Sequence, residues 1–155
     1  HRFPALMADY IEAACAKVVE VYGGDASRVW GGCSRSLDIA GRFADFRGIG
    51  QKKSSMAANI LVRDLGVPVT DQEEIDVSYD VHIRRVFLRS GLVDEDNQEE
   101  LISAARTLHP PYPGALDLPC WYIGRQWCHP NSPGCSDCPV SSACPKRTTL
   151  SVANY

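Results

Sequence analysis

The amino-acid sequence predicts an all-α protein, and three observations support that fold class. Apolar residues recur at intervals of three and four positions along most of the chain, as they do on one face of an α-helix. Glycine or proline stands where most of these periodic segments stop. Segments with the alternating pattern of a β-strand are almost absent. With 155 residues, the chain is expected to form one domain or two small lobes.

Composition and net charge limit the classes of function that the chain can have. The chain is 45% hydrophobic and 23% charged, which is ordinary for a globular protein. Its formal charge of -3 excludes nucleic-acid binding through overall charge, so any DNA contact depends on local basic patches. Basic residues gather in two places, which are Arg42, Arg47, Lys52, Lys53 and Arg63, and then Arg84, Arg85 and Arg89. We find neither a membrane-length apolar run nor a signal peptide, so we expect an intracellular, cytoplasmic protein without a membrane partner.

The first elements follow from the N-terminus. A helix is expected over 7–22, ended by Gly23 and Gly24. Its apolar positions are Tyr10, Ile11, Ala14, Val18, Val19 and Val21. Cys15 falls within that face and is expected to be a small core residue. Residues 25–36 are expected to form a loop or short helix, with Ser36 as a cap for the next helix.

The centre of the chain, residues 37–65, is expected to form a helix, a tight hairpin and a second helix. The hairpin is Gly48-Ile49-Gly50, whose two glycines permit positive φ and a close approach of the backbone. The inward residues of the first helix are expected to be Leu37, Ile39, Ala40, Phe43, Ala44 and Phe46. A helix N-terminus after such a turn is a ready site for an anion, most often a phosphate, although the pattern also fits an ordinary αα turn.

Lys52 falls in the first turn of the second helix of this pair. The positive end of the helix dipole, together with partial burial, would lower the pKa of a lysine at that position. A lysine that is neutral part of the time can act as an amine nucleophile. A solvated lysine that grips a phosphate is the alternative, and it also suits the neighbouring Lys53.

After a polar connection over 67–78, helices are expected over 80–90, 97–108 and 118–127, with a break at 109–113. Asp80 opens the first of them, where aspartate is a favoured cap. A fixed carboxylate there could also orient a lysine amine, take its proton, or stabilise positive charge that grows on a sugar. His82 is interpreted as a packing or hydrogen-bonding residue and not as a general base.

Four cysteines form the strongest motif, Cys128-x6-Cys135-x2-Cys138-x5-Cys144. The prolines and glycine between them predict a loop that folds around a metal. Because no secretory signal accompanies the seven cysteines of the chain, metal ligation is favoured over disulfides. Spacing by itself allows a zinc site with four thiolates or an iron–sulfur cluster. Cys120 stands at a different spacing and is not expected to be a ligand.

Three motifs together resemble the endonuclease III branch of the helix-hairpin-helix DNA glycosylases. They are Gly48-Ile-Gly-Gln-Lys52, Tyr79-Asp-Val-His-Ile-Arg-Arg-Val86 and the cysteine loop, spanning roughly residues 37–147. The resemblance implies part of a six-helix barrel over 1–79, with the helix-hairpin-helix at 37–65, and a helical iron–sulfur domain over 80–155. The 6-2-5 spacing is that of the family's cluster loop. It therefore implies a structural [4Fe-4S] cluster in the loop 128–144, held by Cys128, Cys135, Cys138 and Cys144.

The resemblance also implies an activity. In the family, the lysine at the place of Lys52 attacks C1′ of a damaged nucleotide, and the aspartate at the place of Asp80 assists the attack. The implied protein is a base-excision glycosylase with AP-lyase activity, which acts on double-stranded DNA that carries an oxidised base or an abasic site. It would work at the nucleoid. The implied DNA contacts are Arg47, Gly48, Ile49, Gly50, Gln51 and Lys53.

Two departures from the family pattern leave alternatives open. Residues 129–134 carry no fixed positive charge, whereas family members place Arg or Lys there against phosphate. Only about one of the family's helices before the hairpin is present. We expect a monomer, whose helical barrel is completed by N-terminal helices that are not in this chain. A monofunctional glycosylase, a non-catalytic helix-hairpin-helix module that binds DNA, and a zinc interaction domain are the alternatives.

Overall fold

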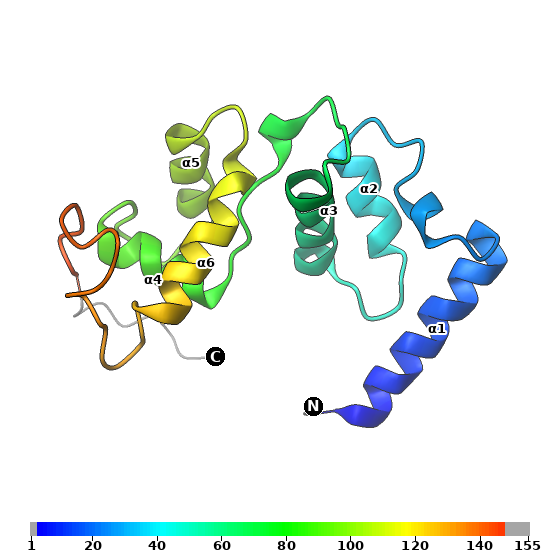
Figure 1. The fold of residues 1–155 in the computed structure, drawn as a ribbon, viewed down its shortest axis with the longest axis horizontal. Helices are drawn as coiled ribbons and strands as arrows, with labels where there is room; N and C mark the ends of the chain where they lie inside the picture. The colour runs from blue at the N-terminus through cyan, green and yellow to red at the C-terminus, as the bar shows by residue number, and fades with distance from the viewer. Residues whose placement is uncertain (1–2, 148–155) are drawn as a thin grey trace. The chain divides into compact units, whose positions relative to one another are not determined.

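The computed structural model describes residues 3–147, and every regular element in that range is helical, which confirms the all-α prediction. This range contains six α-helices, which are labelled in Figure 1, and three short 3₁₀ helices. In chain order these are α1 (Pro4–Tyr22), η1 (Ala26–Val29), α2 (Ser36–Ala44), α3 (Gln51–Leu65), η2 (Gln72–Glu74), α4 (Val81–Ser90), α5 (Gln98–Leu108), η3 (Pro113–Leu116) and α6 (Asp117–Gln126). Among residues 3–147, no helix is long and apolar enough to cross a membrane.

The chain divides into two compact units, residues 1–71 and 72–155, which we call unit 1 and unit 2. Unit 1 contains α1 to α3, and unit 2 contains α4 to α6 (Figure 1). Each unit has its own hydrophobic core. The polar connection over 67–78 therefore contributes residues to both units.

The core of unit 1 lies between α2 and α3, where Ile39 packs with Ala58 and Leu61. Helix α1 contributes no buried residue within the described part of the chain, and Cys15 is exposed. The prediction that Cys15 is a core residue is therefore wrong. Leu37, expected to point inward, is 53% exposed. Periodicity identifies the apolar side of a helix, but it does not show that another element covers that side.

Gly48 makes the hairpin possible. Its φ of 84° lies in the left-handed region, and an added Cβ would meet the ring of Tyr10 at 2.4 Å. Gly50 has φ -91° and ψ 177°, and nothing lies within 4 Å of an added Cβ there. Only the first of the two hairpin glycines is therefore required by the backbone, because only at Gly48 do strain and steric clash coincide.

We expect Gly48→Ala to destabilise the protein by about 2–4 kcal/mol, because left-handed strain adds to the displacement of Tyr10. Gly24→Ala is the matched control, since Gly24 has a similar φ of 81° but no atom within 4 Å of its added Cβ. Chemical denaturation of both variants measures the difference. Equal losses would show that the contact with Tyr10 contributes nothing.

Helix α2 is capped from a distance by Asp71. Its Oδ1 accepts a hydrogen bond of 2.7 Å from the backbone N–H of Ser36, and Arg35 Nε lies 3.6 Å from its Oδ2. Ser36 is the first helical residue and Arg35 is the N-cap without a side-chain cap bond, so the prediction that Ser36 caps this helix is wrong. Burial by itself would raise the pKa of Asp71, but hydrogen bonds from Ser36 and Leu37 outweigh it and lower that pKa.

We expect Asp71→Ala to lower the stability by about 1–2 kcal/mol at neutral pH, because an α2 cap is lost. The folded-state pKa of Asp71 is lowered, so its contribution is complete above the ordinary pKa of an unfolded aspartate. That contribution is lost as the pH falls through the lowered folded-state value. Denaturation curves from neutral to acidic pH should therefore converge for the two proteins, and parallel curves would contradict this assignment.

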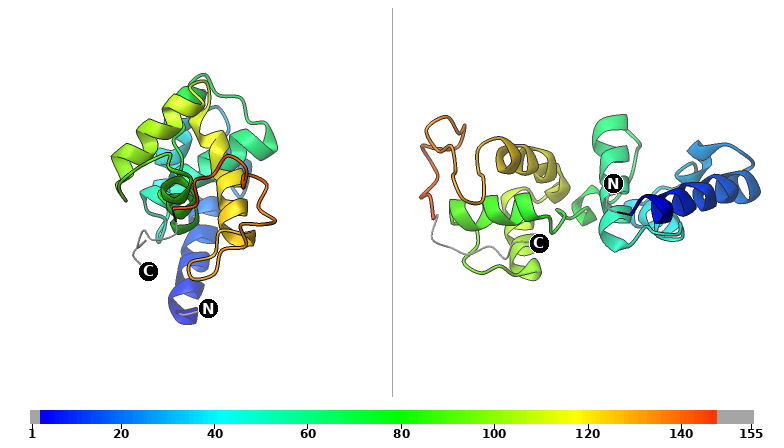
Figure 2. Two further views of the ribbon diagram at one scale, coloured as in Figure 1. Left: turned by 90° about the vertical axis from the view of Figure 1, so that its left-hand side faces the viewer. Right: turned by 90° about the horizontal axis from the view of Figure 1, so that it is seen from below.

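Unit 2 is built around α4, which packs against α6 (Figures 1 and 2). Phe87 is fully buried, and Ile83 and Leu101 are 1% exposed. The two helices approach closely at Gly124, where an added Cβ would lie 2.7 Å from Cβ of His82. Only glycine allows this approach, and it brings α6 against the first turn of α4.

Candidate functional site

The hairpin of unit 1 presents a short, fixed stretch of backbone. The N–H of Ile49 donates to the carbonyl of Phe46 at 3.0 Å, and Lys53 Nζ donates to the carbonyl of Gly48 at 3.0 Å. Gly50 is the N-cap of α3 and has no side chain that could accept hydrogen bonds from the first turn. The positive end of the α3 dipole thus lies directly after the hairpin, where it favours a negative ligand.

The residues expected to contact DNA lie together at the surface of unit 1. All are exposed except Ile49, which is half-buried. Arg47 lies over the ring of Tyr10, with its Cζ 5.8 Å from the ring centroid. Because Lys53 Nζ donates to the Gly48 carbonyl, the positive charge of Lys53 is fixed beside the hairpin backbone. The structure therefore brings the predicted residues onto one surface, and their contact with DNA stays a prediction.

Lys52 is the second residue of α3 and its side chain is exposed in unit 1. The partial burial that the sequence argument required for a neutral lysine is therefore absent from this unit by itself. Its place in the first helical turn, beside the hairpin, is as the sequence predicts. Lys52 lies in unit 1 and Asp80 in unit 2.

Asp80 is the N-cap of α4, as the sequence predicts. Its Oδ1 accepts a hydrogen bond of 3.0 Å from the backbone N–H of His82, and its side chain is half-buried. His82 Nδ1 lies 2.9 Å from Arg85 Nη2, and its ring packs edge-on to Trp121 at 6.1 Å. Because an arginine can only donate, His82 Nδ1 is the acceptor. The interpretation of His82 as a packing and hydrogen-bonding residue agrees with these contacts.

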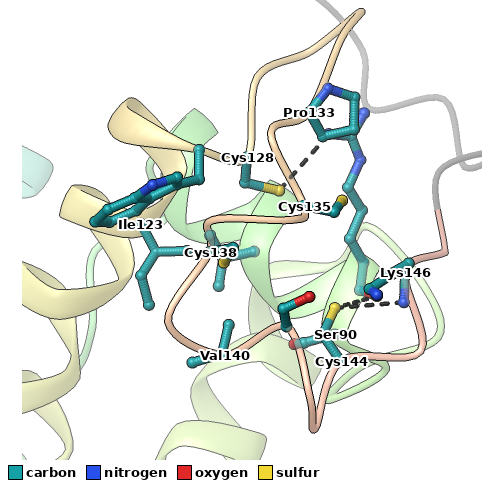
Figure 3. Close-up of a pocket in the computed structure, with 13 residues that line it drawn as sticks. Ser90, Ile123, Cys128, Pro133, Cys135, Cys138, Val140, Cys144 and Lys146 are labelled. Atoms are coloured by element: carbon teal, nitrogen blue, oxygen red, sulfur yellow. Dashed lines mark hydrogen bonds between the residues drawn. The ribbon is translucent and has the colours of Figure 1, made fainter.

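The four motif cysteines line one cavity of unit 2. Figure 3 shows the side chains of Cys128, Cys135, Cys138 and Cys144 around it. The apolar walls come from Val86, Ile123, Pro133 and Val140. All seven cysteines are free thiols, and no set of three or more His, Cys, Asp or Glu side chains within residues 3–147 is arranged to hold a metal ion. Cys120 is buried in the core, and burial raises the pKa of its thiol to about 12.

Two arginines of α4 hold the start of the cysteine loop. Arg85 Nε donates to the carbonyl of Cys128, and its Nη2 donates to the carbonyl of Gly124 at 2.8 Å. Arg89 donates to the carbonyls of His129 and Pro130, both at 2.6 Å, and its Nη1 lies 3.6 Å from Cys128 Sγ. The loop backbone is thus fixed to α4 by charge-assisted hydrogen bonds, which are stronger than neutral ones.

These contacts correct one part of the sequence interpretation. Arg84, Arg85 and Arg89 were counted as a basic patch available to DNA, but they are 5%, 3% and 5% exposed. Inside unit 2, their guanidinium groups donate hydrogen bonds to carboxylate and carbonyl oxygens. Sequence composition shows only that arginines are close together along the chain. Their positions among the apolar residues of a buried helix were the signal that they face the interior.

The cysteine cavity fits an iron–sulfur cluster in its chemistry. Four thiols are the donor set of a [4Fe-4S] cluster, and the walls between them are apolar. The N–H of Lys146 lies 3.3 Å from Cys144 Sγ, and the guanidinium of Arg89 lies beside Cys128 Sγ. Hydrogen-bond donors and positive charge at cysteine sulfurs offset the negative charge of four thiolates.

Comparison with known proteins gives a distant relative. The chain is 29% identical over 121 residues to an adenine DNA glycosylase of Arabidopsis thaliana. The match covers 70% of this chain and 18% of that protein, so the chain spans less than a fifth of the length of the relative. No protein-family model matches the chain. The chain is thus distantly similar to a protein named as an adenine DNA glycosylase.

Proposed function

We propose that this chain is the helix-hairpin-helix and cluster portion of a base-excision DNA glycosylase that also has AP-lyase activity. One observation carries the proposal. Lys52 lies in the first turn of α3, directly after an exposed hairpin, and the N-cap of α3 is Gly50. A nucleophilic lysine and a backbone surface for phosphate are then neighbours within unit 1. Distant similarity to an adenine DNA glycosylase supports DNA that contains a base to be excised as the substrate class.

DNA binding is assigned to the hairpin. Phosphate oxygens of one strand accept hydrogen bonds from the backbone at the start of α3, and Arg47 and Lys53 supply positive charge around them. Contacts of this kind position the duplex but do not read its sequence. The target nucleotide is rotated out of the base stack, since its C1′ cannot be reached inside the duplex.

The chemistry is assigned to Lys52 and Asp80. The Lys52 amine, once deprotonated, forms a bond to C1′ while the glycosidic bond breaks and the base leaves with its electron pair and a proton. The resulting amine adduct opens to a Schiff base, and loss of a proton from C2′ then expels the 3′ phosphate by β-elimination. The Asp80 carboxylate orients or deprotonates the amine and stabilises positive charge on the sugar.

The four cysteines of unit 2 are assigned to a [4Fe-4S] cluster, which is structural and supplies no electrons to base excision. Cys128, Cys135, Cys138 and Cys144 would hold it through their thiolates. The chain's own contribution is a frame for the loop, because hydrogen bonds from Arg85 and Arg89 fix the loop backbone after Cys128. Ligation by the four thiolates would tie the remainder of the loop together.

A monofunctional glycosylase is the second candidate, and one observation favours it. The relative is named for adenine, and adenine in DNA is not an oxidised base. In the helix-hairpin-helix family that the chain resembles, monofunctional members carry another residue in place of Lys52. The lysine therefore favours a glycosylase that also has lyase activity. The two candidates differ in whether the strand is cut after the base is released.

The test measures base release and strand cleavage separately on a panel of duplexes. The panel carries an oxidised pyrimidine, 8-oxoguanine, adenine opposite 8-oxoguanine, uracil and an abasic site. The proposal expects base release from at least one duplex and cleavage of the same strand without alkali. Base release that requires alkali for cleavage would indicate a monofunctional enzyme. DNA binding without base release from any duplex would indicate a non-catalytic module.

A further inference from the structure

We propose that Tyr79, Arg84 and Asp96 form a lock that positions Asp80. For the chemistry of Asp80 the inference rests on the proposed function. For the position of Asp80 it stands on contacts within unit 2 alone. Neither the motifs nor the distant relative assigns a role to these three side chains.

The lock is a closed set of contacts between α4 and the segment before α5. Tyr79 Oη donates to Asp96 Oδ1 and lies equally close to the Asp96 backbone carbonyl, both at 2.8 Å. Arg84 Nε donates to the same Oδ1 at 2.7 Å, and Arg84 Nη2 pairs with Oδ2. The Arg84 guanidinium also lies over the Tyr79 ring, 4.5 Å from its centroid. Each member of the set therefore contacts both others.

Burial of the Arg84 side chain strengthens this set. The side chain of Arg84 is 6% exposed and that of Asp96 is 25% exposed. Hydrogen bonds from Arg84 outweigh burial and, with that from Tyr79, lower the pKa of Asp96. Asp96 is therefore ionised at neutral pH, and a paired charge of this kind is costly to separate when it is largely removed from water.

Two members of the lock lie on either side of Asp80 in the sequence. Tyr79 immediately precedes the N-cap of α4, and Arg84 stands four residues after the cap. Side chains at these two positions often pack together in helices, usually as an apolar pair, and that contact fixes the angle at which the chain enters the helix. In unit 2 the pair is a cation over a ring, and Asp96 ties it to a second segment.

A second carboxylate holds the residue before Tyr79. The backbone N–H of Ser78 donates to Asp117 Oδ1 at 2.7 Å, and the Ser78 hydroxyl lies 3.2 Å from the same atom. Asp117 is 6% exposed, at the start of α6. The N–H of Asp80 in turn donates to the Ser78 carbonyl at 2.8 Å. Both residues that lead into Asp80 are thus held by carboxylates from distant parts of the chain.

This arrangement does more than a cap needs. A cap hydrogen bond needs only an aspartate at the N-cap with a free backbone N–H in the first turn, and it sets no requirement on the residues before the cap. A reacting carboxylate needs a fixed position, because a displacement of about 1 Å can slow a reaction on the order of 100-fold. We therefore assign Tyr79, Arg84 and Asp96 as positioning residues for Asp80.

The decisive variant is Tyr79→Phe, which keeps the ring under Arg84 and removes only the phenol hydrogen bond. Its kcat for base release is expected to fall about tenfold with KM unchanged, because substrate binding is assigned to unit 1. Exchange of the His82 amide, which donates to Asp80, is expected to accelerate about tenfold, while amides in the middle of α4 keep their protection. Tyr122→Phe is the matched control, since Tyr122 is an exposed tyrosine of α6 that packs edge-on to Trp127.

Each outcome decides the inference. Unchanged exchange of the His82 amide in Tyr79→Phe would overturn it, whether or not the protein is an enzyme. Faster exchange with an unchanged kcat would reduce the lock to a stability element and also overturn it. Wild-type protein that releases no base would refute the proposed function, and the amide exchange would still test the lock. If Tyr79→Phe does not fold, Asp96→Asn takes its place, because it keeps an acceptor for Tyr79 but lacks the charge.

Discussion

Replacement of Lys52 by alanine is expected to abolish borohydride trapping on abasic DNA and to slow strand cleavage by about 10³-fold or more, because the nucleophile is removed. Because Lys52 is exposed at the surface of unit 1, this variant is expected to change the free energy of unfolding by no more than about 0.5 kcal/mol. Thermal denaturation checks that the fold is intact, and a trapping gel checks the chemistry. Any loss can then be attributed to the reaction and not to folding.

Two further variants separate charge from nucleophilicity. Lys52→Arg keeps the positive charge beside the hairpin but cannot form a Schiff base, so it should bind DNA like wild type and fail to trap. Lys53→Ala should still trap, although the loss of its hydrogen bond to the Gly48 carbonyl should weaken DNA binding. Trapping that survives in Lys52→Ala and disappears in Lys53→Ala would transfer the nucleophile to Lys53.

Replacement of Cys138 by serine is expected to remove bound iron and to destabilise unit 2 by several kcal/mol, since the loop to which the cluster is assigned contains no helix or strand of its own. Iron content and the brown absorbance of a [4Fe-4S] protein measure the first effect. Thermal denaturation measures the second. Cys138 lines the cavity with the other three motif cysteines, so no free ligand compensates within the loop.

Cys15→Ser is the matched control, because Cys15 is an exposed thiol of α1 in unit 1. It should keep full iron content and stability. Retention of a complete cluster in Cys138→Ser would contradict the ligand assignment. A colourless wild-type protein with one zinc ion bound to the same four cysteines would contradict the cluster itself and favour an interaction domain.

Much of the fold could be predicted because helices are local structures. The apolar period and the glycines and prolines at the ends are read from neighbouring residues, so the α-helices lie within a few residues of their predicted ranges. Asp80 was recognised as a cap for the same reason. Cys15 and Leu37 were misjudged because burial depends on what another segment supplies.

In the candidate site, too, features that depend on neighbouring residues could be predicted, and features that depend on distant partners could not. Cys128, Cys135, Cys138 and Cys144 line one cavity, since a short loop cannot separate them widely, but within residues 3–147 they are not arranged to hold a metal ion. Asp71 was missed as the cap of α2, because its partner Ser36 is 35 positions away and no local pattern marks such a bond. The loop contacts of Arg85 and Arg89 were missed because their acceptors, backbone carbonyls of the loop after α6, carry no sequence signature.

The most direct test of the central assignment is to locate the covalent bond. Wild-type protein is trapped with borohydride on an abasic duplex, the complex is digested, and mass spectrometry identifies the modified residue. The account predicts a deoxyribose remnant on Lys52 Nζ and on no other lysine. A remnant on another residue, or no trapped complex from folded, iron-containing protein, would contradict it.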